Sequence, residues 1–318
     1  MKIKPEEKKG QYRRIYEFLY ESPMIPKSKM AERLGINWIT LDKRLKEALE
    51  YYFILGPEAR RCSNANTLEH IYLFNTEEPD MTYEKYRADP CAVYNARIYG
   101  FCNSLVISKE KIDVEGETLL EGPRSDYYVP FTPDHSFEQA LQSMQGKIRN
   151  INPDDYAPRR FIRTRWNETV KWDEDDEEIF RESKYNLRIK TGVLIKDLHI
   201  SREKINYWFD TLDKRCTIHT LFYPETLPQY QTYLSMIDTD YEDFVIDIFS
   251  ELPATPSFFK VQDKLILMAY LPWRFIDDTY TRATEILSVP LLEAELLTRG
   301  IVKEKRAAIV GRSRKKDL

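Results

Sequence analysis

The fold is decided by a short stretch that occurs twice in the chain. The first copy reads Leu34-Gly35-Ile36-Asn37, and the second reads Leu198-His199-Ile200-Ser201, which begins 164 positions further on (198 against 34). Apolar residues follow both copies at the same offset, which is close to half of the 318 residues. A gap-free match of this kind predicts an internal duplication of about 160 residues. The paired positions are Leu34 and Leu198, Ile36 and Ile200, Asn37 and Ser201, Leu41 and Ile205, Leu45 and Phe209, and Ala48 and Leu212.

Helical patterns lie before and after each copy of this stretch. In the first half, apolar residues recur at helical spacing over 15–19 and again over 27–34. Asn37 is a typical N-cap for a third helix. The second half repeats this order over 179–198, with Ser201 as the cap. Three short helices with a tight turn before the third predict a helix-turn-helix in each half.

The segments that follow the two motifs predict strands and helices in alternation. Apolar runs predict strands at 70–74 and, as the equivalent in the second half, at 218–222. Residues 56–68 are expected to form an extended wing, and 113–124 a polar turn. The other expected elements are helices at 92–101 and 244–252, strands at 104–108, 127–131, 258–261 and 265–273, and helices at 137–148 and 275–287.

We therefore predict an α+β fold with two helix-turn-helix, winged-helix-like modules, each followed by a ferredoxin-like β-α-β-β-α-β domain. The expected boundaries are 1–68 and 166–216 for the modules, and 69–165 and 217–318 for the ferredoxin-like domains. We expect these two domains to pair through their sheets. The prediction leaves open a small-molecule effector between them and a homodimer formed through them.

The motif residues of the second half resemble the Lrp/AsnC family of feast/famine transcriptional regulators. Asn186-Leu187-Arg188-Ile189, followed by Val193-Leu194 and by 198–201, is similar to that family's N-x-R-I, L-A and G-[LI]-S pattern. In the first half Ser22 stands in place of the asparagine. The resemblance implies a tandem fused duplication of a unit that usually dimerises. His199 replaces the glycine of the turn, where the chain often needs a positive φ.

Polar residues on the third helix of each motif are the candidate DNA contacts, because that helix reads base edges in a helix-turn-helix. We expect the first module to bind more strongly, since Glu203 and the acidic run 173–178 would repel phosphate near the second. The expected function is a DNA-binding transcriptional regulator of promoter DNA, and not an enzyme. The candidate DNA-binding residues are Asn37, Trp38, Thr40, Lys43, Arg44, Lys46, Arg202, Lys204, Asn206 and Tyr207.

The overall charge restricts DNA binding to local surfaces. The chain has 48 basic and 52 acidic residues and a net charge of -4, so double-stranded DNA would meet no general positive field. Basic residues gather around 147–171 and in a tail over 303–316, which we expect to be flexible.

Several other classes of protein are disfavoured by missing signals. No run of about 18 apolar residues and no signal peptide is found, so we expect a cytoplasmic protein with no membrane partner. The 4 cysteines are irregularly spaced, which disfavours a disulfide framework or a zinc site. No HExxH, GxSxG, P-loop or GxGxxG sequence occurs, and we predict no cofactor.

Two alternatives remain open at this point. A plasmid-type replication initiator also has tandem winged helices, but lacks ferredoxin-like strands over 70–131. Siroheme decarboxylases share the two-module architecture, and some are fused pairs, so an enzyme of that kind is an alternative by analogy of fold. His70 and His219 stand at matching strand starts, but no carboxylate or cysteine spacing supports a metal site there.

Overall fold

The computed structural model describes residues 4–272 and 281–315. Within these ranges the chain forms two units. The first contains the chain up to Cys62, Val170–Pro228 and Pro253–Thr255, and the second contains Ser63–Thr169, Gln229–Leu252 and the chain from Pro256 onward. Each unit therefore combines residues from both copies of the duplication.

The first helix-turn-helix consists of α1 (Pro5–Glu21), α2 (Lys27–Leu34) and α3 (Trp38–Glu50). Gly35 ends α2 at φ 65°, a left-handed conformation that glycine adopts without strain. Asn37 caps α3, because its side-chain oxygen accepts a hydrogen bond of 2.8 Å from the backbone N–H of Thr40. Apolar side chains from all three helices pack in one buried cluster. The helix-turn-helix expected here is confirmed.

The second helix-turn-helix consists of α6 (Glu174–Ser183), α7 (Thr191–Leu198) and α8 (Arg202–Asp210), which the short α9 (Leu212–Arg215) extends. His199 ends α7 at φ 58° and takes the left-handed position that Gly35 has in the first copy. Ser201 caps α8. The predicted motif is again confirmed.

A two-stranded antiparallel ribbon joins these two modules. β1 (Ile54–Arg61) follows α3, β6 (Cys216–Phe222) follows α9, and the register pairs Ile54 with Phe222. Each strand ends in the core of the other module, since Phe222 packs among α1 to α3 and Ala59 packs among α6 to α8. β6 is thus the counterpart of β1. The expected equivalence of 218–222 with 70–74 is wrong, because both ribbon strands follow directly on a helix-turn-helix.

The second unit contains an eight-stranded antiparallel sheet made of two similar halves, in the order β5-β2-β4-β3-β10-β7-β9-β8. In each half the fourth strand in sequence lies beside the first, and then come the third and the second. This is the ferredoxin-like arrangement, so the predicted α+β fold is confirmed, and the strands over 70–131 exclude the replication initiator. The strands are β2 (His70–Asn75), β3 (Ala92–Gly100), β4 (Ser104–Ser108), β5 (Glu117–Pro123), β7 (Tyr230–Asp238), β8 (Ser257–Val261), β9 (Lys264–Pro272) and β10 (Glu304–Lys315).

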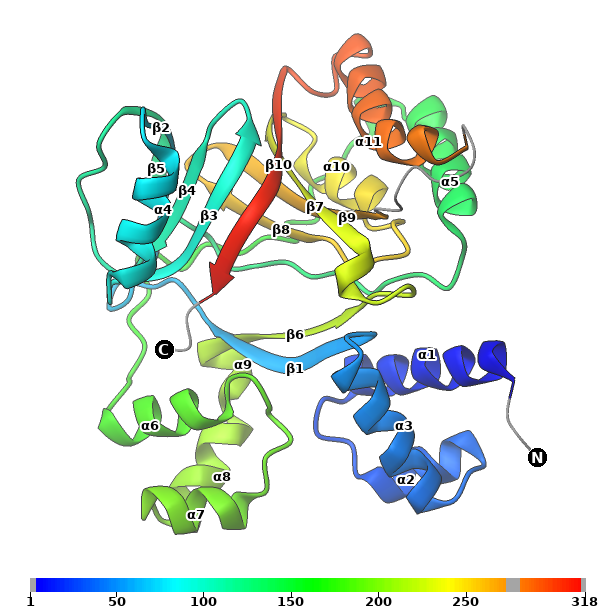
Figure 1. Ribbon diagram of the computed structural model, residues 1–318, viewed down its shortest axis with the longest axis vertical. Helices are drawn as coiled ribbons and strands as arrows, with labels where there is room; N and C mark the ends of the chain where they lie inside the picture. The colour runs from blue at the N-terminus through cyan, green and yellow to red at the C-terminus, as the bar shows by residue number, and fades with distance from the viewer. Residues whose placement is uncertain (1–3, 273–280, 316–318) are drawn as a thin grey trace. The chain divides into compact units, whose positions relative to one another are not determined.

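Helices cover one face of this sheet (Figure 1). α4 (Pro79–Ala88) lies on the first half, whereas α10 (Glu242–Phe249), α11 (Thr281–Thr298) and α5 (Phe137–Asn150) lie on the second. α5 thus follows the first half in sequence but packs on the second, where Met144 joins the buried cluster of α10 and α11. The other face forms a buried core shared by strands of both halves.

Three of the expected elements are wrong. Residues 92–101 form strand β3 and no helix. A bulge between Ala92 and Tyr94 interrupts the alternation of its side chains, which hides the two-residue period of a strand. Residues 113–124 contain strand β5 where a polar turn was expected. Residues 127–131 form no strand, and Tyr128 makes only an isolated bridge to Phe258.

Glu304–Lys315 of the basic C-terminal segment form a central strand of the sheet, which corrects the expected flexible tail. Lys316, the last residue of that expected tail, lies outside the described residues. β10 pairs with β3 on one side and with β7 on the other. Of the expected helix at 275–287, residues 275–280 lie outside the described residues, and the rest belongs to α11. None of the helices in the described ranges combines the length and the apolarity needed to span a bilayer.

Candidate functional site

The candidate site lies where the two halves of the sheet meet, on the face that carries the helices. There β3 and β10 run side by side between α4 and α11 (Figure 1). Arg97 of β3 is paired with Arg312 of β10, and Tyr99 with Ile309. Directly paired residues of an antiparallel ladder project to the same face. We call these four residues the β3–β10 junction.

Arg97 is poorly neutralised for a side chain that is only 18% exposed. Its Nε lies 3.5 Å from a carboxylate oxygen of the exposed Asp80 on α4, which is too long for a good hydrogen bond. Its Nε and Nη1 are buried and have no hydrogen-bond partner among the described residues. Because an unpaired buried donor is costly, this guanidinium favours an additional anionic partner.

Arg312 supplies the second positive charge of the junction. Its guanidinium lies 4.6 Å from the ring centroid of Tyr83 on α4, and its Nη2 lies 3.3 Å from a carboxylate oxygen of Glu84. Like charges that face each other across a ladder repel. The carboxylates of Asp80 and Glu84 on α4 offset part of the repulsion between Arg97 and Arg312. Two opposed guanidinium groups are also a suitable arrangement for binding carboxylates.

Asn95 fixes the position of α4 beside the arginines. It lies on β3 two residues before Arg97 and is 2% exposed. Its Nδ2 donates a hydrogen bond of 2.8 Å to the backbone oxygen of Tyr83. Its Oδ1 is buried and has no hydrogen-bond partner within the described part of the chain. The contact holds the ring of Tyr83 where Arg312 can stack on it.

The remaining half of the junction is apolar and open. Tyr99 is 58% exposed and Ile309 is 39% exposed, and neighbouring exposed side chains of this size are typical of binding surfaces. Gly311 makes room for the tyrosine, because a Cβ at this glycine would lie 2.1 Å from Cε2 of Tyr99. The junction therefore combines an apolar surface with a pair of cations.

A buried acid–base cluster lies beside the junction. Tyr233 of β7 is paired with Ile309, and its hydroxyl donates a hydrogen bond of 2.6 Å to Oε2 of Glu293 on α11. Lys305 of β10 donates to the same oxygen at 2.8 Å. Burial raises the pKa of Tyr233, and the charge of Glu293 raises it further, so the hydroxyl stays protonated. Oε1 of Glu293 is buried without a hydrogen-bond partner among the described residues.

The residues expected to contact DNA in the first half lie on and before α3, in the first unit. Arg44 is buried, and its guanidinium donates to Gln11 at 2.8 Å and to Glu47 at 2.9 Å. The guanidinium of Arg44 is therefore bonded within the first helix-turn-helix module. Asn37 forms the cap with Thr40, and Lys46 pairs with Asp42. The exposed members of the set are Asn37, Trp38, Lys43 and Lys46.

The expected contacts in the second half lie on α8 of the same unit. Lys204 is engaged internally, since its Nζ lies 2.7 Å from Asp173 and 2.9 Å from Asp176. These two carboxylates belong to the capping box of α6. Arg202, Asn206 and Tyr207 are exposed. The two sets thus remain on separate helices, and none of their members belongs to the β3–β10 junction.

Sequence reasoning missed the junction because its two strands were misread. Arg97 and Tyr99 fell in a segment expected to be a helix, and Arg312 fell in the expected flexible tail. One signal was present: beyond the bulge, Asn95, Arg97 and Tyr99 alternate with apolar residues, which is the period of a half-buried strand.

The histidines do not form a metal site. His70 begins β2 and His219 lies inside β6, in different units, so they are not at equivalent positions. Burial lowers the pKa of His70, and the charge of Lys111 lowers it further. Among the described residues, no group of histidine, cysteine and acidic side chains could hold a metal ion.

Comparison with known proteins identifies relatives of the fold only. No family model and no curated protein matches the chain. It is similar to the crystal structure of the siroheme decarboxylase NirDL, with 11% identity and a TM-score of 0.52 over 96% of this chain and 92% of that one. It is also similar to NirDL in co-complex with an iron-uroporphyrin III analogue, with 12% identity and a TM-score of 0.50 over the same shares of the two chains, 96% and 92%.

These matches correct the functional prediction. The arrangement of helix-turn-helix modules and ferredoxin-like halves that the motifs indicated is shared with these structures at the level of fold. The prediction of a DNA-binding regulator without enzyme activity is contradicted, because the solved structures that share this fold over nearly the whole chain are an enzyme. The motifs misled because a helix-turn-helix is a structural unit that proteins of different function contain.

Proposed function

We propose that this protein is an enzyme that decarboxylates an iron tetrapyrrole of the siroheme type. The observation that carries the proposal is the extent of the fold match: both helix-turn-helix modules and both ferredoxin-like halves, fused in one chain, correspond to siroheme decarboxylase NirDL over 96% of this chain. A match limited to one module would carry no such weight, because single modules recur in unrelated proteins.

The β3–β10 junction has the chemistry that such a substrate requires. An iron tetrapyrrole of this type combines a flat, largely apolar ring system with several carboxylate side chains. Arg97 and Arg312 offer guanidinium groups to carboxylates, while Tyr99 and Ile309 offer an exposed apolar surface to the ring. The arginine pair for the carboxylates and the apolar pair for the ring are thus neighbours in the β3–β10 ladder.

The reaction also requires a proton. In each step the bond between the carboxylate carbon and the neighbouring methylene carbon breaks, CO2 leaves, and the electron pair stays on the methylene carbon. A proton then completes a methyl group. Tyr233, Glu293 and Lys305 form a hydrogen-bonded cluster beside Ile309. Because Tyr233 keeps its proton, we propose that Lys305, the charged donor of this cluster, supplies the proton.

The test is a titration followed by product analysis. The purified protein is mixed with siroheme and, separately, with iron-uroporphyrin III under anaerobic conditions. Visible absorbance measures binding, and mass spectrometry measures the loss of CO2. We expect a saturable spectral change and stepwise decarboxylation of siroheme. Absence of any spectral change with both compounds contradicts the proposal, and binding without CO2 release contradicts its enzymatic part.

Substitutions locate the site. Arg97→Gln and Arg312→Gln should each weaken binding by about tenfold, which is the effect of losing one hydrogen-bonded charge. The control is Arg299→Gln, at an exposed position directly after α11, where the arginine pairs with Glu295 of that helix. If all three variants bind equally, the tetrapyrrole does not bind at the junction.

A further inference from the structure

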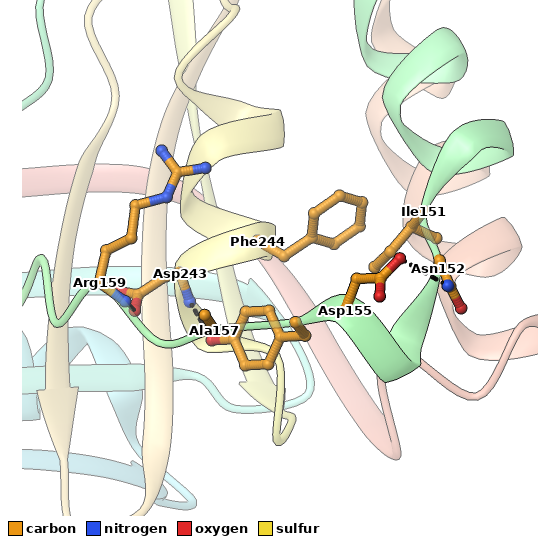
Figure 2. A pocket seen from close by; sticks show the side chains of 8 residues that line it. Ile151, Asn152, Asp155, Ala157, Arg159, Asp243 and Phe244 are labelled. Carbon is orange, nitrogen blue, oxygen red and sulfur yellow. Dashed lines mark hydrogen bonds between the residues drawn. The ribbon is translucent and has the colours of Figure 1, made fainter.

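The second unit contains a pocket built from residues other than those of the junction (Figure 2). Its volume is about 310 Å³, at the lower end of the range found for small-molecule sites. It lies between the end of α5, the short 3-10 helix η1 (Pro153–Asp155) and the start of α10. The side chains drawn in Figure 2 line it, including Ile151, Asn152, Asp155, Arg159 and Phe244.

One wall of the pocket is fixed by a buried carboxylate. The side chain of Asp243 accepts hydrogen bonds from three successive backbone N–H groups, those of Arg159, Arg160 and Phe161. The backbone N–H of Asp243 in turn donates to the hydroxyl of Tyr156 at 3.2 Å. The charge of Asp243 is therefore satisfied within the protein, and the segment 156–161 is held against α10 before any ligand arrives.

The open walls are aromatic and apolar. The rings of Tyr156 and Phe244 and the side chain of Ile151 line the cavity and are only partly buried. Tyr156 is braced from behind by Tyr241, at a centroid distance of 5.1 Å. Aromatic faces attract cations as well as apolar groups. The walls therefore suit a ring or alkyl group that carries a positive charge.

The charges around the pocket favour the same kind of ligand. Asp155 accepts a hydrogen bond of 2.6 Å from Nδ2 of Asn152, but within the described residues it forms no ion pair. Arg159 points toward Asp247, at 3.8 Å, and toward the ring of Phe161, at 5.4 Å. Figure 2 shows its guanidinium on the opposite side of the pocket from Asp155. Among the acidic residues described in the lining, Asp155 is therefore the one whose charge is left available for a ligand.

We infer that this pocket binds a small organic amine in its protonated form, with the ammonium group at Asp155 and the apolar part between Tyr156 and Phe244. The inference rests on the pocket alone and is independent of the proposed decarboxylase activity. A cavity of about 310 Å³ has room for a single-ring amine.

The test uses three probes that share one phenyl ring and differ in the charge of the attached polar group: benzylamine, benzyl alcohol and benzoate. Binding to the full chain is measured by ligand-observed NMR and by calorimetry. We expect benzylamine to bind with a dissociation constant on the order of 1 mM, as is typical of fragments, and the alcohol to bind at least about tenfold more weakly. Failure of benzylamine to bind overturns the inference.

Two substitutions on opposite sides of the pocket complete the test. Asp155→Asn keeps the size of the side chain and should weaken benzylamine binding by about tenfold. Arg159→Gln removes the competing positive charge and should leave benzylamine binding unchanged or tighter. Benzoate binding that is lost in Arg159→Gln would mean that the site takes anions and would overturn the inference. Unchanged melting temperatures show that both variants are folded.

Discussion

Two strand pairings connect the two copies of the duplicated unit, β1 with β6 and β3 with β10, and these two joints differ in the contacts that their side chains make. In the first, the ends of the strands are buried in module cores, and Arg61 has an acidic partner, Glu177, at 3.1 Å. In the second, an arginine faces an arginine and large apolar side chains are exposed. A joint that serves stability alone does not leave such groups open, and this contrast distinguishes the β3–β10 junction as the candidate site.

The largest effect is expected at the buried joint. Phe222→Ala removes a ring that is 6% exposed and stacks on Tyr16 at a centroid distance of 5.0 Å. We expect a loss of about 3–5 kcal/mol in unfolding free energy, the usual result for a buried phenylalanine. Urea unfolding followed by circular dichroism measures it. The control is Tyr51→Ala, at an exposed position after α3. A loss below about 1 kcal/mol would show that the ribbon contributes little to stability.

Arg188 provides a second, smaller test of the same joint. Its Nη1 donates hydrogen bonds to the backbone oxygens of Pro23, at 3.0 Å, and Ile25, at 2.8 Å, so it links the two modules of the first unit. Arg188→Met should cost about 1.5–3 kcal/mol, because the two carbonyls lose a charged donor. Arg181→Met, at an exposed position of α6, is the matched control, and equal melting temperatures for the two variants would contradict this role.

The two joints can be compared directly by one substitution in each. Arg61→Gln removes the pair with Glu177 and a cation–π contact of 3.9 Å with Trp172, and should cost about 1 kcal/mol. Arg97→Gln removes a cation–π contact of 5.3 Å with Tyr99 but also one of two opposed charges, so stability should change by less than about 0.5 kcal/mol. Thermal unfolding of both variants measures the difference. A larger loss for Arg97→Gln would mean that this arginine is structural.

The smallest effect is a pH dependence that belongs to neither joint. Burial lowers the pKa of His70 below its usual value of 6.5, so the unfolded chain binds a proton more readily than the folded one. The contribution to stability is complete above pH 6.5 and is lost as the pH falls through the lowered pKa. His70→Asn should flatten this part of the stability profile between about pH 7 and pH 5. An unchanged profile would contradict the assignment.

Local patterns predicted the helix-turn-helix modules well. Asn37 and Ser201 cap their helices as expected, and the turn at His199 adopts the positive φ of Gly35. Each of these features depends on residues within one turn of each other. Because such local features recur in both halves, the offset of 164 between 34 and 198 was enough to predict the duplication from the sequence.

The sheet was harder to predict because its partners are distant in sequence. Arg97 lies on a strand because β3 pairs with β10, and 304–315 form a strand because they pair with β3 and β7. Local patterns also could not predict that α5 packs on the second half of the sheet. They show that the helix has an apolar face, but not which half of the sheet that face contacts. The candidate site lies on these two strands and was therefore missed together with them.

The central position of β10 has a consequence for the order of folding. Ala308 pairs with Gly100, 208 positions earlier (308 against 100), and contacts of such long sequence separation form slowly. Until residues 304–315 are inserted, β3 and β7 are both open strand edges, and open edges recruit other chains. Insertion of β10 therefore covers both edges in one step and joins the two half-sheets.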